Sequence, residues 1–169
     1  KLRAARLLWA AVMQRYAPGN TDAAGMEIHS VTSRLNKSLT DPHMNILRTQ
    51  TEAMAAILGG TDSLTVEPFD ISSGKANDFS ERIARNQQLI LKEESYFDKV
   101  ADPAGGSYYV ENLTNLIAGS AWRLFLEIEK NGGFLKSLVN GSISEKIDEN
   151  AKKLKDEIFR KRIVIPSSF

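Results

Sequence analysis

One helix that runs through a double-glycine stop into a short strand constrains the fold of this chain more than any other feature. The stretch Arg48–Leu64, RTQTEAMAAILGGTDSL, holds most of this helix, the glycine stop and the beginning of the strand. Asp41-Pro42 predicts the start of the helix, because a carboxylate caps the first turn and proline fits the first helical position. Gly59-Gly60 predicts its end, since glycine adopts the left-handed conformation that closes helices. Leu64 and Val66 then predict a short strand.

Another helix and strand precede this segment, and further helices follow it. Helical periodicity over 2–16 ends at a Pro-Gly-Asn turn, and residues 26–32 predict a strand. Asp78 and Glu81 resemble a capping box at the start of a helix that ends near Glu94. Apolar spacing and glycine stops predict the remaining elements: helices at about 113–130, 134–139 and 144–161, and an extended tail at 163–169.

This alternation of helices and strands predicts the α/β fold class, helix-rich, with the two strands paired in parallel through a helical crossover. Two strands cannot close a sheet on themselves and would leave exposed edges. We therefore expect more chain, or a partner, to complete the sheet. The 169 residues begin at Lys1 in the middle of a helical pattern, which favours a piece of a longer protein.

Composition excludes several functions. A net charge of +1 does not give the clustered basic surface of a nucleic-acid-binding protein. No apolar run approaches the roughly 20 residues of a membrane span, and no signal peptide is visible. The chain has no Cys, which excludes disulfides and fits a reducing compartment, so we expect a cytoplasmic protein. His29 and His43 are the only histidines, too few for a His-based catalytic zinc site.

Few residues suggest chemistry by themselves, and no catalytic residue is predicted. His29 lies in a predicted strand beside a loop, and the C-terminal ends of barrel strands face active sites. The residues alone favour a hydrogen-bonded structural histidine there. His43 lies in the first turn of a helix, and we expect it to be exposed. Arg48 lies in the second turn, near where a substrate anion would bind, with a surface salt bridge as the alternative.

A series of sequence blocks in a fixed order adds a family to this interpretation. The blocks extend along nearly the whole chain, to about Lys161, and include NILRT at 45–49, EAMAA at 52–56, GGT at 59–61, RIARNQ at 82–87 and DPAGGSYYVE at 102–111. Together they resemble the methylmalonyl-CoA mutase family. So many ordered blocks are far more specific than any single short motif.

The resemblance implies a fold and a reaction. Members of the family have a TIM-type (β/α)8 barrel that holds an acyl-CoA along its axis. Adenosylcobalamin lies across its C-terminal face, carried mainly by a separate flavodoxin-like domain, and supplies the radical chemistry that converts methylmalonyl-CoA to succinyl-CoA. By this resemblance, residues 1–130 hold the last two strand–helix units of a partial barrel. Residues 131–162 form post-barrel helices, and 163–169 form a tail or linker.

The chain departs from catalytic members where the strands would meet the cofactor. Catalytic members continue the first strand as His-x-Gln-Thr-Ser-Gly-Trp. This chain keeps His29 but has Val31 for the glutamine and Arg34-Leu35 for Gly-Trp. Valine neither donates nor accepts a hydrogen bond. After the second strand, Glu67 stands for an asparagine and Ile71 for a glutamate. This pattern resembles the small, non-catalytic subunit of bacterial heterodimeric mutases.

We therefore expect a piece of the small subunit of adenosylcobalamin-dependent methylmalonyl-CoA mutase, structural and not catalytic, with the large catalytic subunit as partner. Adenosylcobalamin and acyl-CoA would bind the complex and not this piece alone, with His29 as the only candidate cofactor contact. The cobalt-ligating DxHxxG motif is absent, because Asp41-Pro42-His43 is followed by Ile46 where the motif has Gly. Two alternatives remain: a piece of a catalytic acyl-CoA mutase with altered cofactor contacts, and a non-enzymatic interaction module.

Overall fold

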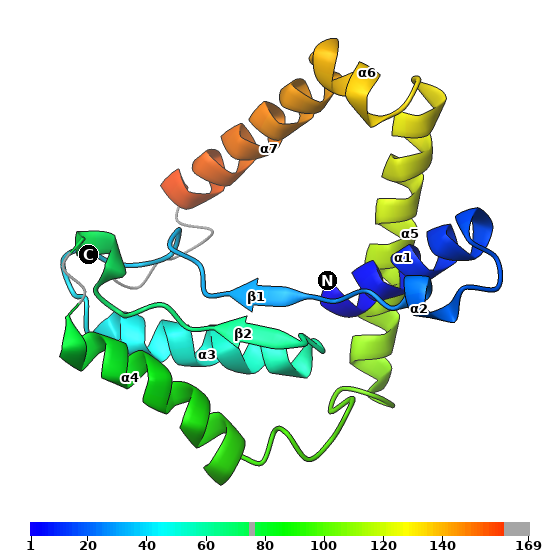
Figure 1. The fold of residues 1–169 in the computed structure, drawn as a ribbon. Helices are drawn as coiled ribbons and strands as arrows, with labels where there is room; N and C mark the ends of the chain where they lie inside the picture. The colour runs from blue at the N-terminus through cyan, green and yellow to red at the C-terminus, as the bar shows by residue number, and fades with distance from the viewer. Residues whose placement is uncertain (75–76, 161–169) are drawn as a thin grey trace. The chain divides into compact units, whose positions relative to one another are not determined.

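The computed structural model describes residues 1–74 and 77–160 (Figure 1). Helices and strands follow in the predicted order, with short additions. The elements are α1 (Leu2–Tyr16), α2 (Thr21–Ala24), β1 (His29–Val31), α3 (Met44–Leu58), β2 (Ser63–Thr65), the 3₁₀ helix η1 (Ile71–Ser73), α4 (Asp78–Leu89), the π-helix η2 (Ile90–Glu94), α5 (Tyr108–Lys130), α6 (Phe134–Val139) and α7 (Ser142–Phe159). The tail predicted at 163–169 lies outside the described residues.

The strands β1 and β2 form a parallel two-stranded sheet, as the alternation predicted, with His29 opposite Ser63. The helix α3 connects them. β1 is shorter than the strand predicted at 26–32. The reason is that Ile28 donates its N–H to the Asp62 carboxylate at 2.7 Å, and not to a strand carbonyl. The α/β class is confirmed, whereas the partial TIM-type barrel remains a prediction.

The helix α3 begins at Met44, three residues after Asp41, where the Asp41-Pro42 pair predicted its start. The residues before it form a tight turn, because Asn45 and Ile46 each donate to a carbonyl three residues earlier, at 3.0 Å. The predicted start is therefore wrong in position. Asp41 nevertheless caps the chain there, since its Oδ1 accepts the N–H of Met44 at 3.4 Å.

The end of α3 confirms the predicted glycine stop. Thr61 donates its N–H to the carbonyl of Ala56 at 3.2 Å, and Gly60 donates to Ile57 at 2.9 Å. This pair of bonds is the Schellman arrangement, which needs one left-handed residue. Gly60 supplies it with φ 80°, while Gly59 remains helical at φ −80°. The double glycine thus turns the chain directly into β2.

The cap of α4 lies one residue earlier than predicted. Asn77, and not Asp78, is the N-cap: its side chain accepts the N–H of Ser80 at 3.2 Å, and Ser80 Oγ accepts the N–H of Asn77 at 3.0 Å. Asp78 and Glu81 instead lie in the first turn, where carboxylates favour the helix dipole. The helix passes into the π-helix η2 and ends at Glu94, as predicted.

A small apolar core lies between α3, α4 and β2. It consists of Ala53, Val66, Ala84 and Leu91, with Met54, Ile57, Leu64 and Phe97 packed against it. Figure 1 shows both helices on one side of the sheet. Leu89 and Ile90 are exposed, whereas Leu91, within the wider π-turn, is the buried residue of this segment.

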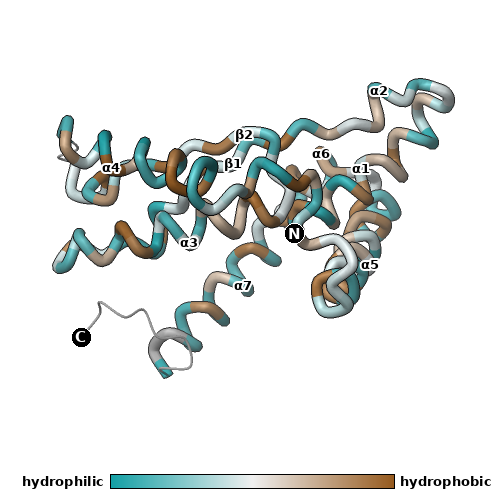
Figure 2. The backbone as a smooth tube through the Cα atoms, turned by 90° about the horizontal axis from the view of Figure 1, so that it is seen from below, coloured by the Kyte–Doolittle hydropathy of each residue, from teal (hydrophilic) through white to brown (hydrophobic). Residues whose placement is uncertain are grey.

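The C-terminal helices follow the predicted pattern. Figure 2 shows apolar and polar stretches interspersed along α7, which fits an amphipathic helix. The helix α6 has the predicted bounds, whereas α7 begins at Ser142, two residues earlier than expected, where Asn140 Oδ1 accepts the N–H of Ser142 at 3.2 Å. None of the helices in the described part of the chain has the length and hydropathy that a bilayer crossing requires.

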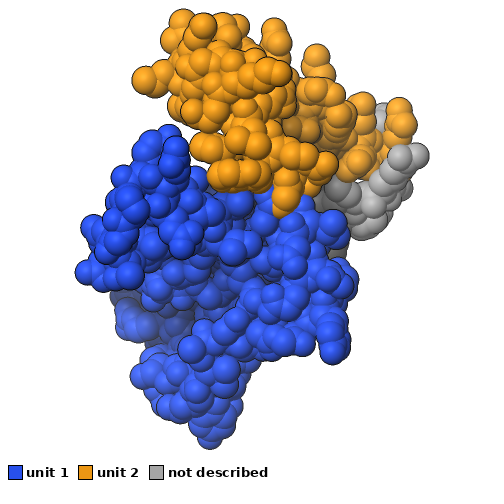
Figure 3. Space-filling view, turned by 90° about the vertical axis from the view of Figure 1, so that its right-hand side faces the viewer, with its two compact units in different colours: residues 1–118 blue, residues 119–169 orange. Residues whose placement is uncertain are grey.

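The chain divides into two compact units (Figure 3). The first comprises residues 1–118 and contains the sheet, the core and the start of α5. The second comprises residues 119–169, and its described part holds the remainder of α5 with α6 and α7. These units reflect packing, and the division at residue 130 that the barrel resemblance implies remains a prediction.

Candidate functional site

One face of the sheet is exposed, and it carries His29. Along each strand the outer residues are exposed and the middle residue is half-buried, so alternate side chains point to opposite faces. The exposed face therefore holds His29 and Val31 from β1, with Ser63 and Thr65 opposite them on β2. The other face carries Leu64 into the core.

Both ring nitrogens of His29 make hydrogen bonds within this face. Nδ1 lies 2.7 Å from Ser63 Oγ, and Nε2 lies 3.2 Å from Thr65 Oγ1. The two hydroxyls fix the ring across the strand pair. This geometry agrees with the structural histidine that the residues alone favoured, while the predicted cofactor contact of His29 remains a prediction. Its neighbour Val31 is 53% exposed and offers only methyl groups.

An ion pair joins the two loops at the C-terminal end of the sheet. Arg34 follows β1 and Glu67 follows β2. Arg34 Nε lies 2.7 Å from Glu67 Oε2, and its Nη2 bonds the other carboxylate oxygen. The bond from Arg34 lowers the pKa of the Glu67 carboxyl below its ordinary value. The two side chains are the departures from the family pattern noted above, and the structure shows that they are partners.

Glu52 of α3 holds the loop that carries Arg34. Its carboxylate accepts the N–H of Ser33 at 2.9 Å, an amide N–H of Asn36, and the ammonium of Lys37 at 2.9 and 3.0 Å. The Lys37 side chain is fully buried. A buried cation requires such a partner, so the loop is fixed to the middle of α3.

Asn45 also ties the two loops together. It is fully buried. Its Oδ1 accepts the N–H of Ser38 at 2.8 Å, and its Nδ2 donates to the carbonyls of Ser38 and Phe69, both at 2.9 Å. Arg48 also donates to Asn45 Oδ1, at 2.8 Å. The candidate anion-binding arginine of the sequence thus takes part in this structural network.

Two polar residues that lie within the family blocks, Thr49 and Gln87, join α3 to α4. Gln87 donates its amide to the carbonyl of Ile46 at 2.8 Å and lies within 3.2 Å of Thr49 Oγ1. Both Gln87 and Thr49 are buried. Buried polar groups without partners are costly, so this pairing accounts for their place in the blocks. We find a structural explanation here and no catalytic one.

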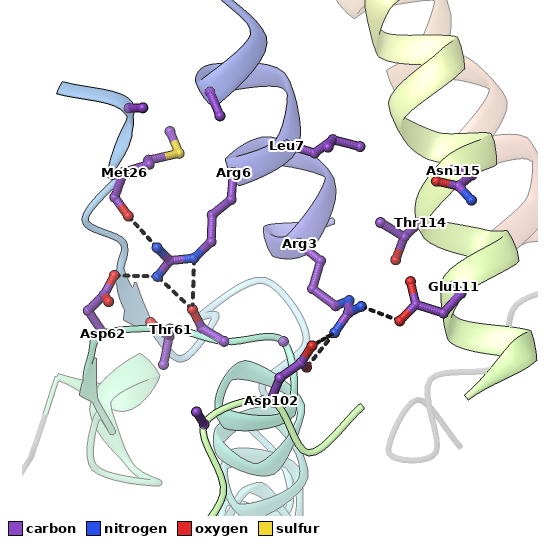
Figure 4. A pocket seen from close by; sticks show the side chains of 16 residues that line it. Arg3, Arg6, Leu7, Met26, Thr61, Asp62, Asp102, Glu111, Thr114 and Asn115 are labelled. Carbon is purple, nitrogen blue, oxygen red and sulfur yellow. Dashed lines mark hydrogen bonds and ion pairs between the residues drawn. The ribbon is translucent and has the colours of Figure 1, made fainter. Parts of the chain in front are cut away.

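A hollow of about 740 Å³ lies at the opposite, N-terminal end of the strands (Figure 4). Its two arginines are engaged: Arg3 binds Asp102 and, at 2.6 Å, Glu111, and Arg6 binds Asp62 and two backbone carbonyls. The pKa of Asp62 lies below its ordinary value, chiefly because the carboxylate accepts a backbone N–H and then because of Arg6. These bonds hold α1 and the start of α5 to the strands.

Sequence reasoning missed Arg3, Arg6 and Glu52 as organising residues. The partner of Arg3 lies as far as 108 residues away, so no local pattern identifies it. For Glu52 the one signal was its place in the EAMAA block. In the described residues, no cluster of His, Asp and Glu has the geometry of a metal site.

The parallel β1–α3–β2 unit with its flanking helices defines an α/β protein built around a strand–helix–strand unit. Comparison with known sequences then gives the family. A sequence profile described as methylmalonyl-CoA mutase matches residues 1–166. The chain belongs to the methylmalonyl-CoA mutase family, as its ordered blocks predicted.

Relatives of several kinds lie close in sequence. The chain is 48% identical over 167 residues to the methylmalonyl-CoA mutase small subunit of Porphyromonas gingivalis, and 42% identical over 158 residues to the large subunit of that organism. It is 46% identical over 165 residues to the methylmalonyl-CoA mutase of Rhizobium meliloti. These alignments cover 98%, 94% and 98% of the chain but 27%, 22% and 23% of the relatives. The chain therefore spans about a quarter of their length.

Proposed function

We propose that this chain is a segment of a small-subunit mutase protein that supports a catalytic partner subunit and performs no chemistry itself. The observation that carries the proposal is the Arg34–Glu67 ion pair, which joins the two loops at the sheet end where catalytic members meet their cofactor. Each partner alone would leave a charge without its counterpart. Together they form a structural contact in place of a binding surface.

The residues of this end do not fit adenosylcobalamin, the cofactor that the family resemblance implies. Val31 presents methyl groups where a hydrogen-bonding amide is expected. The Arg34–Glu67 pair occupies the position of a glycine and an asparagine. His29 is bonded to two hydroxyls of β2. We therefore derive no catalytic step for this chain through the cofactor.

In the proposed assembly, the large subunit binds adenosylcobalamin and an acyl-CoA and isomerises methylmalonyl-CoA to succinyl-CoA in the cytoplasm. Residues 1–130 would contribute the last two strand–helix units of a barrel, and 131–162 the helices after it. Support comes from the similarity of this chain to both the small and the large subunit of one organism. Two chains of one fold are suited to a pseudo-symmetric pair.

The test uses the full-length protein that contains this segment, produced alone and together with the large subunit of the same organism. With adenosylcobalamin and methylmalonyl-CoA, we expect no turnover by the full-length protein alone and turnover by a co-purified complex. Turnover by the full-length protein alone would refute the proposal. Failure to co-purify with the large subunit would refute the supporting role.

A catalytic mutase with altered cofactor contacts is the second candidate. Two retained residues favour it, His29 and Asp70, which the family pattern also has at these positions. Asp70 is buried, and its carboxylate accepts the Asn77 amide at 3.4 Å, next to the cap of α4. This bond gives Asp70 a structural role. Absorbance titration of the full-length protein with adenosylcobalamin separates the two candidates, since only the second expects saturable binding.

A further inference from the structure

The Arg34–Glu67 pair spans the loops that follow β1 and β2. We infer that this pair, held in place by Glu52, closes the C-terminal end of the sheet against a bulky planar ligand. The inference rests on the proposed function, because it names the device that would keep this subunit free of the cofactor. It adds that two side chains, Arg34 and Glu67, produce the closure. Substitution of both should therefore remove it.

Both partners of the pair start from fixed backbone. Thr32 donates its N–H to the carbonyl of Thr65 at 3.1 Å, and Glu67 donates its N–H to Thr32 Oγ1 at 3.0 Å, so the ladder continues up to the pair. On the other side, Glu52 binds Ser33, the residue directly before Arg34. A fixed backbone reduces the entropy that the long arginine side chain loses on pairing.

The Arg34–Glu67 ion pair is bidentate. Both carboxylate oxygens of Glu67 receive guanidinium N–H groups. The Glu67 side chain is only 15% exposed, whereas Arg34 is 64% exposed and reaches across from the other loop. A bidentate arginine–carboxylate contact has a defined plane and direction, which a lysine–carboxylate contact lacks. The contact therefore joins the two loops in a set orientation.

The charges around the pair cancel. Arg34 and Lys37 carry two positive charges, and Glu52 and Glu67 carry two negative charges, all within linked contacts. Such a cluster offers no net charge to a phosphate or carboxylate ligand. It also explains why the two departures occur together: arginine without Glu67, or Glu67 without arginine, would unbalance the cluster.

The test measures access to the sheet face beside the pair. The segment has no Cys, so Val31→Cys introduces a single thiol on the exposed face of β1. In the full-length protein, we compare the labelling rate at position 31 by a small reagent, iodoacetamide, with that by a bulky planar maleimide dye. Peptide mass spectrometry reads the site. The labelling rate with the maleimide dye, divided by the labelling rate with iodoacetamide, reports closure independently of any turnover.

The pair is removed in the form that the family pattern suggests, Arg34→Gly with Glu67→Asn. Removal of the pair should raise the rate ratio up to about fivefold. The control removes a different exposed pair, Glu127→Ala with Lys146→Ala, and should leave the ratio unchanged. If the first double variant does not fold, Arg34→Ala with Glu67→Ala replaces it.

An unchanged ratio in a folded double variant would overturn the inference. A rise in that variant, absent from the control, would support it. This outcome is distinct from failure of the proposed function, which is decided by turnover of the unsubstituted protein.

Discussion

Replacement of Asn45 by alanine is the most informative perturbation of the sheet end. The side chain is fully buried and makes three bonds to backbone groups of two different loops. Each lost bond of this kind removes about 1 kcal/mol, so Asn45→Ala should lower local stability by about 3 kcal/mol. The loops after β1 and β2 would then open together, since the same residue joins Ser38 and Phe69.

Hydrogen exchange of the full-length protein measures this local opening. A loss of about 3 kcal/mol corresponds to exchange about 100-fold faster for the amides of residues 36–40. Leu47→Ala is the matched control, because Leu47 lies on the same helix but is 61% exposed. Its effect should stay within about 0.5 kcal/mol. Equal exchange in the two variants would refute the view that Asn45 holds the sheet end together.

Three further predictions follow from the described contacts. Gln87→Ala removes two bonds to α3 and should destabilise the full-length protein by about 2 kcal/mol in urea unfolding, whereas the exposed neighbour change Asn86→Ala should have little effect. Gly119→Ala, in open space within α5, should stabilise by about 1 kcal/mol. Gly60→Ala should instead destabilise by about 1 kcal/mol, because Gly60 has φ 80° and alanine is strained in this left-handed conformation. The melting temperatures of the two glycine variants test both expectations. Because the pKa of Asp62 is lowered in the folded state, its contribution is present above the unfolded pKa of about 4 and is lost as pH falls through the folded pKa. The difference in melting temperature between the unsubstituted protein and Asp62→Asn should therefore shrink below about pH 4, and a constant difference from pH 7 to 3 would contradict this assignment.

The sequence predicted the local elements well where the signal was local. Gly60 closes α3 as the double glycine predicted, and α6 has the predicted bounds, because glycine stops act on adjacent residues. The cap of α4 was placed one residue late, at Asp78. Asn77 and Asp78 are both good N-caps, and only the folded backbone decides which one leaves the helix.

The candidate site was predicted only in part. The sequence identified Val31, Arg34 and Glu67 as departures from the family pattern. It did not show that Arg34 and Glu67 bind each other across 33 residues. Nor did it show that Glu52 fixes the loop that carries Arg34. Such pairings depend on where the sheet and α3 bring the chain, so the spacing along the sequence does not reveal them.

By itself, then, the sequence determined the family, the order of helices and strands and their parallel pairing. Those properties follow from periodicity, glycine stops and ordered blocks, which are written in neighbouring residues. Tertiary structure alone decided which side chains meet at the two ends of the sheet: Arg34 with Glu67 at one end, and Arg3 and Arg6 with their carboxylates at the other. The physical reason is that ion pairs form between groups a few ångströms apart in space, and folding brings together residues that are distant in the chain.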